Sequence, residues 1–367
     1  AVLACVAVFC TISGNSFHQM RTATEEIIPG EGVTEVRMLS DYFPDLAGTA
    51  GDTQIYVLQG EQEGGSCLIL GGTHANELGG HMGAVLFVEN AKVEAGTLYV
   101  IPRTNNSAFT HNDPQEGHPS TVHITTDEGN VREFIHGSRA TNPVDQWPDP
   151  DVYVNYMGQS LSGSENRNIN RTYPGKADGT LTEMMSYGIV QLINTENIDV
   201  TVDLHEASPE YPVINALIAH ERAMNLASNV VVDMQMEGVQ ISLEPSPTDL
   251  RGLTHRELGD HTDTLALLME APNPAQGRLR DRTDEALVLT GKSETYVKAG
   301  EIGQLYVPYD ENGWPIEVRC ARHVFGIERI LANYSEMYEE PIIVTGMPSY
   351  DELVKNGMGP YLNEPTT

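Results

Sequence analysis

Three short apolar runs constrain the fold of this chain more than any other feature. They are "SCLILGG" (66–72), "IDVTVDLHEA" (198–207) and "TLALLMEAP" (264–272), and each contains a nearly continuous apolar stretch. A strand that is buried on both faces has this composition, and longer stretches with helical spacing separate the runs. The sequence therefore predicts an α/β fold with a mixed, largely parallel central sheet and helices on both faces.

The remaining expected elements continue this alternation. "TQIYVLQG" (53–60) and the run at 66–72 are expected to be neighbouring strands, with "EGG" (63–65) as the turn between them. A further strand is expected at 96–105, and helices are expected at 77–91, 181–197 and 217–235. After about residue 275 no linker-like composition occurs, so we expect residues 25–367 to form a single domain.

Residues 106–165 interrupt this pattern. They are rich in Asn, Asp, Pro, Gly and Ser, and four histidines lie among them at positions 111, 118, 123 and 136. A long loop in a compact domain is usually a lid or a binding loop, although a plain surface insertion is an equal alternative. The histidines are expected to be solvated loop residues.

The chain is strongly acidic, with 52 Asp and Glu residues against 21 Lys and Arg and a formal net charge of −31. Because phosphate contacts require a cationic face, this charge argues against nucleic acid as a partner and against stable membrane binding by the folded domain. A substrate that carries a carboxylate must then be bound by a few well-placed arginines. The oligomeric state stays open.

The chain starts with a run of twelve residues, "AVLACVAVFCTI", that holds no charged side chain. It is too short to span a bilayer, but it suits the apolar part of a signal peptide or the end of a membrane anchor. We therefore interpret residues 1–24 as a signal or anchor remnant with its linker and expect an extracytoplasmic protein, secreted or membrane-anchored; a buried N-terminal strand is the alternative. Cys67 and Cys320 can pair in an oxidising compartment or remain buried thiols.

Metal-ligating and proton-transferring side chains stand where the predicted strands end. The strand at 66–72 is followed by His74 and Glu77, the strand at 198–204 by His205, and the strand at 264–269 by Glu270. Ligands in open α/β sheets gather at these carboxyl ends. Two imidazoles and one carboxylate, with a fourth position left for water, form a catalytic zinc set, so we expect one Zn²⁺ bound by His74, Glu77 and His205. A helix cap with a surface histidine is the alternative for the first pair alone.

Four segments in order resemble the motifs of the zinc carboxypeptidase superfamily, and within it the succinylglutamate desuccinylase/aspartoacylase branch. They are "GGTHANELGG" (71–80), "NRNINRTYPG" (166–175), "TVDLHEA" (201–207) and "LLMEAPNP" (267–274). The resemblance implies that His74, Glu77 and His205 bind zinc. It also implies that Glu270 is the general base and that Asn170 and Arg171 bind a substrate carboxylate.

Two positions depart from the family pattern. The family has an Asp that orients a zinc histidine where this chain has Asn168, and an amide oxygen supplies less negative charge to that imidazole. The expected consequence is weaker zinc binding or a substitute for the missing carboxylate, such as Glu165. The arginine that stabilises the oxyanion is unsettled, with Arg167 the first candidate and Arg103 the second.

Two other histidine-containing features are expected to be without a metal. "THRELGDH" (254–261) has histidines six positions apart, which on a helix point to separate faces. His81 is expected on the surface of its helix.

The sequence thus predicts a zinc-dependent hydrolase that cleaves an amide bond next to a free carboxylate, as a deacylase of N-acyl amino acids does. The expected substrate is a small molecule or short peptide that bears a carboxylate. A metallocarboxypeptidase acting on peptide C-termini is one alternative, and a non-catalytic carboxylate-binding pseudoenzyme is another. The presence of Glu270 favours catalysis over the pseudoenzyme.

Overall fold

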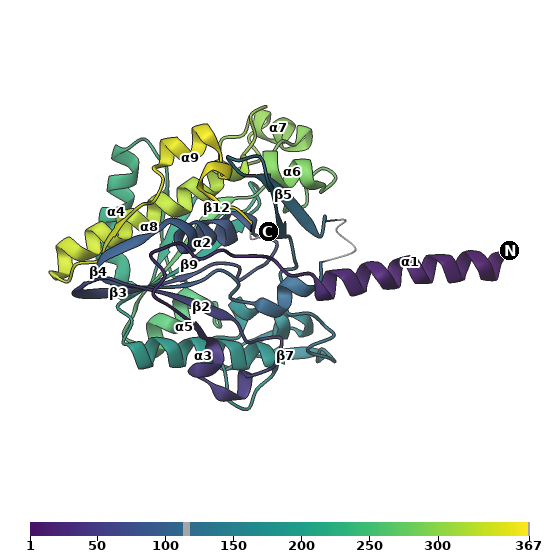
Figure 1. The fold of residues 1–367 in the computed structure, drawn as a ribbon, viewed down its shortest axis with the longest axis horizontal. Helices are drawn as coiled ribbons and strands as arrows, with labels where there is room; N and C mark the ends of the chain where they lie inside the picture. The colour runs from purple at the N-terminus through teal and green to yellow at the C-terminus, as the bar shows by residue number, and fades with distance from the viewer. Residues whose placement is uncertain (113–117, 366–367) are drawn as a thin grey trace.

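The computed structural model describes residues 1–112 and 118–365, and it contains the expected α/β fold (Figure 1). A nine-stranded sheet lies at its centre, in the order β1-β2-β4-β3-β9-β12-β10-β11, with β13 also paired to β4. The strands of this sheet are β1 (Glu35–Met38), β2 (Gln54–Gln59), β3 (Gln62–Leu70), β4 (Lys92–Ile101), β9 (Val200–Ala207), β10 (Ala216–Ala219), β11 (Ser242–Pro245), β12 (Leu265–Pro272) and β13 (Ile343–Thr345).

The middle of the sheet is parallel. β4, β3, β9 and β12 pair side by side in parallel, and the antiparallel pairs lie toward the edges. Alternate side chains of β3 enter two different cores, with Cys67 and Ile69 in one and Leu68 and Leu70 in the other. Burial on both faces explains why these strands are continuously apolar.

Helices cover both faces, as predicted. In Figure 1, α2, α4, α8 and α9 lie on one side of the sheet and α3 and α5 on the other. The helices are α1 (Val2–Thr22), α2 (Leu78–Asn90), α3 (Leu181–Glu196), α4 (Met224–Met236), α5 (Thr254–His261), α6 (Glu285–Thr290), α7 (Glu294–Glu301), α8 (Ile316–Tyr338) and α9 (Tyr350–Asn356). The segment beyond residue 275 packs on the same core, because α8 lies against α2 and α4 while β13 pairs with β4.

The prediction that the strands at 53–60 and 66–72 are neighbours in the sheet is wrong. β2 and β3 do not pair, because β4 lies between them. The "EGG" glycines belong to β3 and not to a turn, at the point where β3 passes close to the start of β4. A Cβ on Gly64 would lie 1.9 Å from the carbonyl oxygen of Pro341, so glycine permits the close approach of the segment that leads into β13.

The helix predicted at 217–235 is also partly wrong. Its first residues form β10, and α4 begins only at Met224. "ALIA" is a four-residue strand with every residue buried, and a short apolar run of this kind cannot be told from the start of a helix by periodicity.

The segment 106–165 contains more structure than the loop that was expected. It holds two hairpins, β5 (Thr121–Thr125) with β6 (Val131–Ile135) and β7 (Val152–Val154) with β8 (Ser160–Ser162). His123 is exposed as predicted, whereas His118 and His136 are buried, so the expectation of solvated histidines is wrong for these two. Residues 113–117 of the proposed lid lie outside the described residues.

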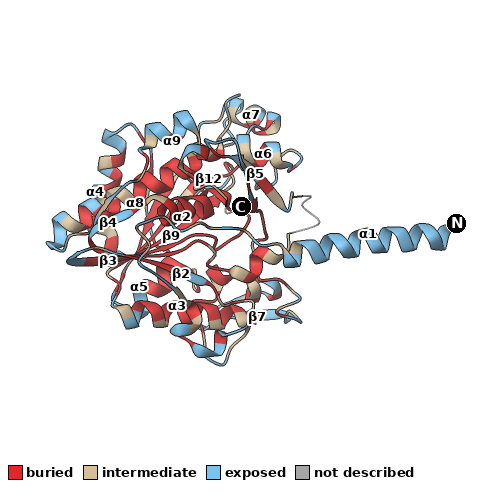
Figure 2. Ribbon diagram, viewed as in Figure 1, coloured by how far each residue is buried: buried red, intermediate tan, exposed pale blue. Residues whose placement is uncertain are grey.

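Helix α1 projects from the domain, and none of its residues is buried (Figure 2). A buried N-terminal strand is therefore excluded. The apolar run at residues 1–12 is by itself too short to span a bilayer, but α1 continues beyond it. The 21 residues of α1 have a mean hydropathy of 1.2 over the most apolar window, which by length and composition is enough to cross a membrane; signal sequences have the same properties. Cys67 and Cys320 are both buried free thiols.

Candidate metal centre

The turn after β3 places the first two donors. β3 ends at Leu70, and Gly72 follows with a φ of +60°. A Cβ at this position would lie 2.5 Å from the carbonyl oxygen of Pro102, so only glycine fits. The chain then turns through His74, and Glu77 takes the N-cap position of α2. The turn thereby brings the imidazole and the carboxylate together.

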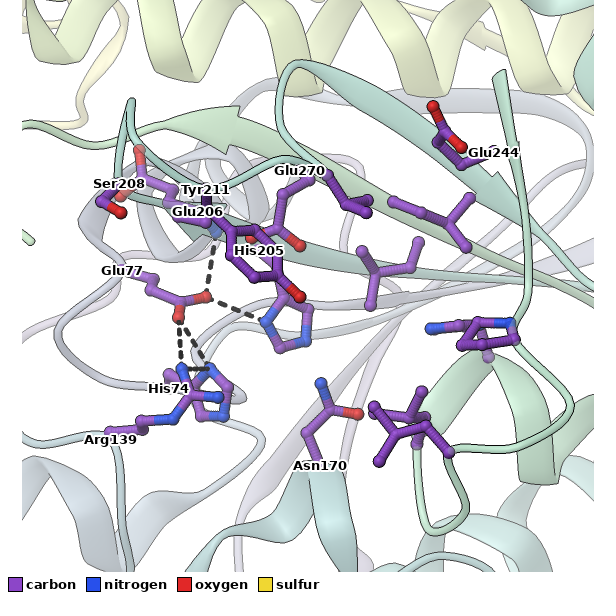
Figure 3. A pocket seen from close by; sticks show the side chains of 18 of the residues that line it. His74, Glu77, Arg139, Asn170, His205, Glu206, Ser208, Tyr211, Glu244 and Glu270 are labelled. Atoms are coloured by element: carbon purple, nitrogen blue, oxygen red, sulfur yellow. Dashed lines mark hydrogen bonds and ion pairs between the residues drawn. The ribbon is translucent and has the colours of Figure 1, made fainter. Parts of the chain in front are cut away.

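The third donor, His205, comes from β9, the strand beside β3. Nδ1 of His74 lies 2.7 Å from Oε1 of Glu77, and Nδ1 of His205 lies 2.9 Å from Oε2 of the same carboxylate. Ligand atoms of all three residues lie within 4.8 Å of one another, and all three side chains are buried (Figure 3). Two imidazoles and a carboxylate in this arrangement can hold a divalent metal ion, and the donor set is one that zinc prefers.

The outer nitrogen of each imidazole has its own acceptor. Nε2 of His74 lies 2.9 Å from Oδ1 of Asn168, and Nε2 of His205 lies 2.8 Å from Oδ2 of Asp203. The hydroxyl of Thr73 donates to the other oxygen of Asp203 at 2.6 Å. When Nε2 donates to these oxygens, Nδ1 of each ring keeps a lone pair for a metal. Asn168 thus occupies the orienting position behind His74.

The triad is a tightly coupled electrostatic unit. Burial and the guanidinium of Arg139 lower the pKa of His74 to about 4. Burial alone would raise the pKa of Glu77, but the two histidines outweigh it and hold that pKa well below its ordinary value. Burial likewise opposes the charged form of His205, while the carboxylates of Asp203 and Glu77 raise its pKa well above the ordinary value. The carboxylate of Glu77 is therefore held in its ionised form, which is the form that binds a cation.

Glu270 stands beside the triad on the neighbouring strand. It pairs in register with His205 across the parallel β9–β12 pair, which places both side chains on the same face of the sheet. Its carboxyl lines the same cavity as the three donors (Figure 3). Burial raises the pKa of Glu270 to about 8, and a cation held by the triad would lower it toward neutrality.

A buried ion pair supports the strand end that carries His205. Nη1 of Arg319, on α8, donates to both carboxylate oxygens of Glu206 at 2.8 and 3.0 Å, and neither side chain is exposed. Nδ2 of Asn273, just beyond β12, donates to the same carboxylate at 3.0 Å. Glu206 is therefore a structural link between β9, α8 and the end of β12.

The cavity, with a volume of about 390 Å³, also contains the predicted carboxylate-binding pair. Asn170 and Arg171 also line it, on the short 3-10 helix η5 (Ile169–Arg171). Oδ1 of Asn170 accepts from the backbone N–H and the hydroxyl of Thr254, at 2.8 and 3.0 Å. Because its oxygen is held in this way, the amide group of Asn170 is left to donate to a ligand.

The floor of the cavity beyond Glu270 is a row of paired residues on three strands. Leu268 on β12 pairs with Ile218 on β10, which pairs in turn with Glu244 on β11. All three line the cavity, together with Val213 and Leu253. A ligand lying along this row would meet an apolar floor first and a carboxylate at the far end, where Figure 3 shows Glu244 well away from the triad.

The two arginines considered for the oxyanion lie elsewhere. Nε and Nη2 of Arg167 donate to both carboxylate oxygens of Asp149, at 2.7 and 2.9 Å. Arg103 is stacked over the ring of Phe109, with 4.6 Å between its guanidinium carbon and the ring centroid. Neither arginine lines the cavity of the triad.

Arg139, which the sequence did not single out, lines that cavity instead. Its Nη1 lies 3.4 Å from both Nδ1 of His74 and Oε1 of Glu77, and its side chain is 43% exposed. It follows β6 inside the segment 106–165, where neither periodicity nor spacing marks it. Its position upstream of the Asn170–Arg171 pair was the one available signal.

The other histidine-containing features hold no metal cluster, since the triad is the one such group of His, Cys, Asp or Glu among the described residues. On α5, His255 is buried with Nδ1 2.8 Å from the hydroxyl of Ser246, while His261 is partly exposed, as their predicted separate faces require. The expectation for His81 is wrong: it is buried, with Nε2 2.8 Å from Oε1 of Glu25. This contact joins the segment after α1 to α2, the helix whose N-cap is Glu77.

No family model matches the sequence, and no curated protein matches it. Solved structures of similar fold include a metallo-carboxypeptidase from Burkholderia cenocepacia (12% identity, 88% of this chain and 68% of that chain, TM-score 0.47). They also include a succinylglutamate desuccinylase/aspartoacylase from Rhodobacter sphaeroides (14%, 78% and 59%, TM-score 0.41) and the tripeptide-bound cell shape determinant Csd4 from Helicobacter pylori (12%, 82% and 59%, TM-score 0.47).

The first two of these structures carry names from the superfamily and branch that the motifs resemble. The chain spans 56–59% of the length of the first three structures that it matches. With such low identities, the likeness concerns the fold and carries no residue roles over to this chain.

Proposed function

We propose that this chain is a zinc-dependent hydrolase that cleaves an amide bond next to a free carboxylate, as in the deacylation of an N-acyl amino acid. The observation that supports it is the convergence in one cavity of His74, Glu77, His205 and Glu270 with a carboxylate-binding pair. A pseudoenzyme that binds carboxylates would need the pair but not Glu270.

Each of these residues has a separate role in the proposed reaction. The Arg171 guanidinium, a planar fork with several N–H donors, binds the substrate carboxylate together with the amide of Asn170. Glu270 takes a proton from the attacking water and returns it to the leaving amine. Zn²⁺ bound by the triad would supply the Lewis acidity that makes water nucleophilic near neutral pH.

Arg139 takes the role for which Arg167 and Arg103 were considered. Its Nη1 is 3.4 Å from two of the donor groups, and its exposed side chain can reach a carbonyl oxygen held above them. A fixed cation at that point stabilises the negative charge that develops on the carbonyl oxygen during attack.

The apolar floor formed by Leu268 and Ile218 favours a substrate whose carboxylate-bearing residue has an apolar side chain. The same floor would suit the C-terminal residue of a peptide, so a metallocarboxypeptidase is the second candidate. Both reactions use the same metal, base and carboxylate-binding pair, and they differ in the acyl side of the substrate.

We also propose that the protein acts outside the cytoplasm. Helix α1 is long and apolar enough to serve as a signal sequence or anchor, and none of its residues is buried. Residues that follow it, such as Glu25 beside His81, are part of the folded domain.

The substrate class is tested with N-acetyl amino acids and short peptides, each assayed with and without a chelator. We expect turnover of N-acetyl amino acids with apolar side chains that the chelator abolishes and Zn²⁺ restores. Faster turnover of peptides with a free C-terminus would favour the carboxypeptidase. Turnover of neither class by zinc-loaded protein would contradict the proposed function.

A further inference from the structure

Glu165 connects the two halves of the site. It lies on the 3-10 helix η4 (Gly163–Arg167), and its Oε2 accepts a hydrogen bond from Nδ2 of Asn168 at 2.8 Å. The same oxygen lies 3.7 Å from Nε of Arg171. One carboxylate thus contacts the residue behind a metal-ligand histidine and the residue that binds the substrate carboxylate.

The orientation of the Asn168 amide follows from its neighbours. Its Oδ1 accepts from the backbone N–H of Asn170 at 3.1 Å and lies 2.9 Å from Nε2 of His74. Its Nδ2 faces Glu165, whose ionised carboxylate can only accept. The oxygen of the amide is therefore fixed toward His74. That imidazole donates from Nε2 and keeps the lone pair of Nδ1 for a metal.

The negative charge nearest to Nε2 of His74 is therefore not on residue 168 itself. It is on Glu165, which His74 reaches through the amide of Asn168. An amide oxygen carries less negative charge than a carboxylate, but hydrogen bonds in a chain polarise one another. The carboxylate of Glu165 pulls on the N–H end of the Asn168 amide and makes its oxygen a better acceptor for His74. The side chain of Glu165 is 33% exposed and that of Arg171 20%, so the link runs along the edge of the cavity.

We propose that Glu165 is a positioning residue that supplies, through Asn168, the negative charge behind His74 and at the same time holds Arg171 in place. The second half rests on the proposed function, since it concerns the binding of a substrate carboxylate. The first half rests only on the metal-binding triad and can be tested without any turnover.

The first test measures Zn²⁺ affinity by competition with a chromophoric chelator. Glu165→Gln keeps the size of the side chain and removes its charge, and it should lower the affinity about 10- to 100-fold, as changes behind a metal ligand do. In the background of Asn168→Asp, the same replacement should leave the affinity unchanged or raise it. There a carboxylate already faces His74, and Glu165 would only repel it.

A matched control is available in Asp149→Asn. This carboxylate also pairs with an arginine of η4, but it contacts none of the triad. The Asp149→Asn variant should bind Zn²⁺ with the affinity of the unaltered protein, and circular dichroism should show that all variants are folded. Equal losses from Glu165→Gln in both backgrounds, or no loss in either, would overturn the role of Glu165 behind His74.

The second test measures substrate binding in the unaltered protein, Glu165→Gln, Asn168→Asp and the double variant, each saturated with Zn²⁺. Glu165→Gln should raise KM for N-acetyl-L-leucine roughly three- to tenfold in both backgrounds, with a smaller change in kcat. Arg171 keeps the hydrogen bond from its Nη1 to the backbone oxygen of Asn170 at 2.6 Å, but it loses its charged partner whatever residue stands at 168. Should the protein hydrolyse no amide, calorimetric binding of the same compound replaces KM. An unchanged KM or Kd would overturn the link to Arg171 and leave the metal result standing.

Discussion

The chemistry of single residues in this site depends on which nitrogen of each histidine faces Glu77. In both cases it is Nδ1, because Asn168 and Asp203 occupy the Nε2 side. The proximity of the three donors and Glu270 could be predicted from the sequence, since each stands at or just beyond the end of an apolar strand. Arg139 could not, because a guanidinium on a long side chain reaches the cavity from a segment with no periodic pattern.

Replacing Glu270 tests the proton transfer. Glu270→Gln should keep the bound Zn²⁺ and lower kcat by about 10²- to 10⁴-fold, because the amide cannot accept a proton from water. Metal content and steady-state kinetics of the same preparation check this. Turnover equal to that of the unaltered protein would remove Glu270 from its role.

Replacing Arg139 tests the assignment of the charge-stabilising group. Arg139→Met should lower kcat by about a hundred- to a thousandfold with little change in KM, as loss of one oxyanion donor does. The matched control is Arg167→Met, since Arg167 pairs with Asp149 and does not line the cavity. A larger loss of kcat in Arg167→Met than in Arg139→Met would reverse the assignment.

At the scale of helices and strands, the sequence predicted the buried parallel strands well because burial on both faces leaves a continuous apolar run. It did not predict that β4 lies between β2 and β3, since strand order depends on where the chain crosses the sheet. The glycines of "EGG" resemble a turn, yet Gly64 lies inside β3 and permits the close approach of Pro341. The sequence predicts one helix over β10 and α4 because no Gly or Pro separates the four-residue strand from the helix.

The contact between α8 and β9 should contribute strongly to stability. Arg319→Met would leave the buried carboxylate of Glu206 without its charged partner, and it should lower the free energy of unfolding by about 3–5 kcal/mol. Urea unfolding of metal-free protein measures this. Adding Glu206→Gln to the variant should recover part of the loss, whereas a further loss would contradict the proposed cause.

Helix α8 also makes the stability of the domain dependent on pH. Burial raises the pKa of Glu328 from 4.5 in the unfolded chain to about 7. The folded state therefore binds this proton more tightly, and the resulting stability is complete below pH 4.5 and is lost as the pH rises through 7.

Glu328→Gln removes this titration. At pH 8 the variant should be more stable than the unaltered protein by ~1–2 kcal/mol, a value reduced for the partial exposure of the side chain, and at pH 4.5 the two should be equal. Urea unfolding at both values checks this, with Glu336→Gln, at an exposed position of the same helix, as the control. A difference that does not depend on pH would contradict the assignment.

At the scale of the whole molecule, two features have opposite consequences for membrane binding. The net charge of −31 disfavours binding of the domain to an anionic membrane surface, whereas α1 is long and apolar enough to lie in a bilayer. The native thiols distinguish the possible states of α1. Cys5 and Cys10 lie on α1 and are exposed, whereas Cys67 and Cys320 are buried in the domain.

A water-soluble maleimide applied to cells that export the protein should therefore label no thiol of the folded chain. Labelling in SDS should then reveal four thiols if α1 remains in a membrane and two if it has been removed. Rapid labelling of two thiols on a folded, soluble chain would contradict export through α1, and Cys5→Ser with Cys10→Ser should abolish that signal.

The central claim is that His74, Glu77 and His205 bind one metal ion together, and elemental analysis after exhaustive dialysis tests it most directly. We predict about one zinc per chain in the unaltered protein and none in His205→Ala, while Asp149→Asn, which leaves the triad intact, keeps its zinc. A chain without stoichiometric metal, or a His205→Ala variant with undiminished zinc, would contradict the claim.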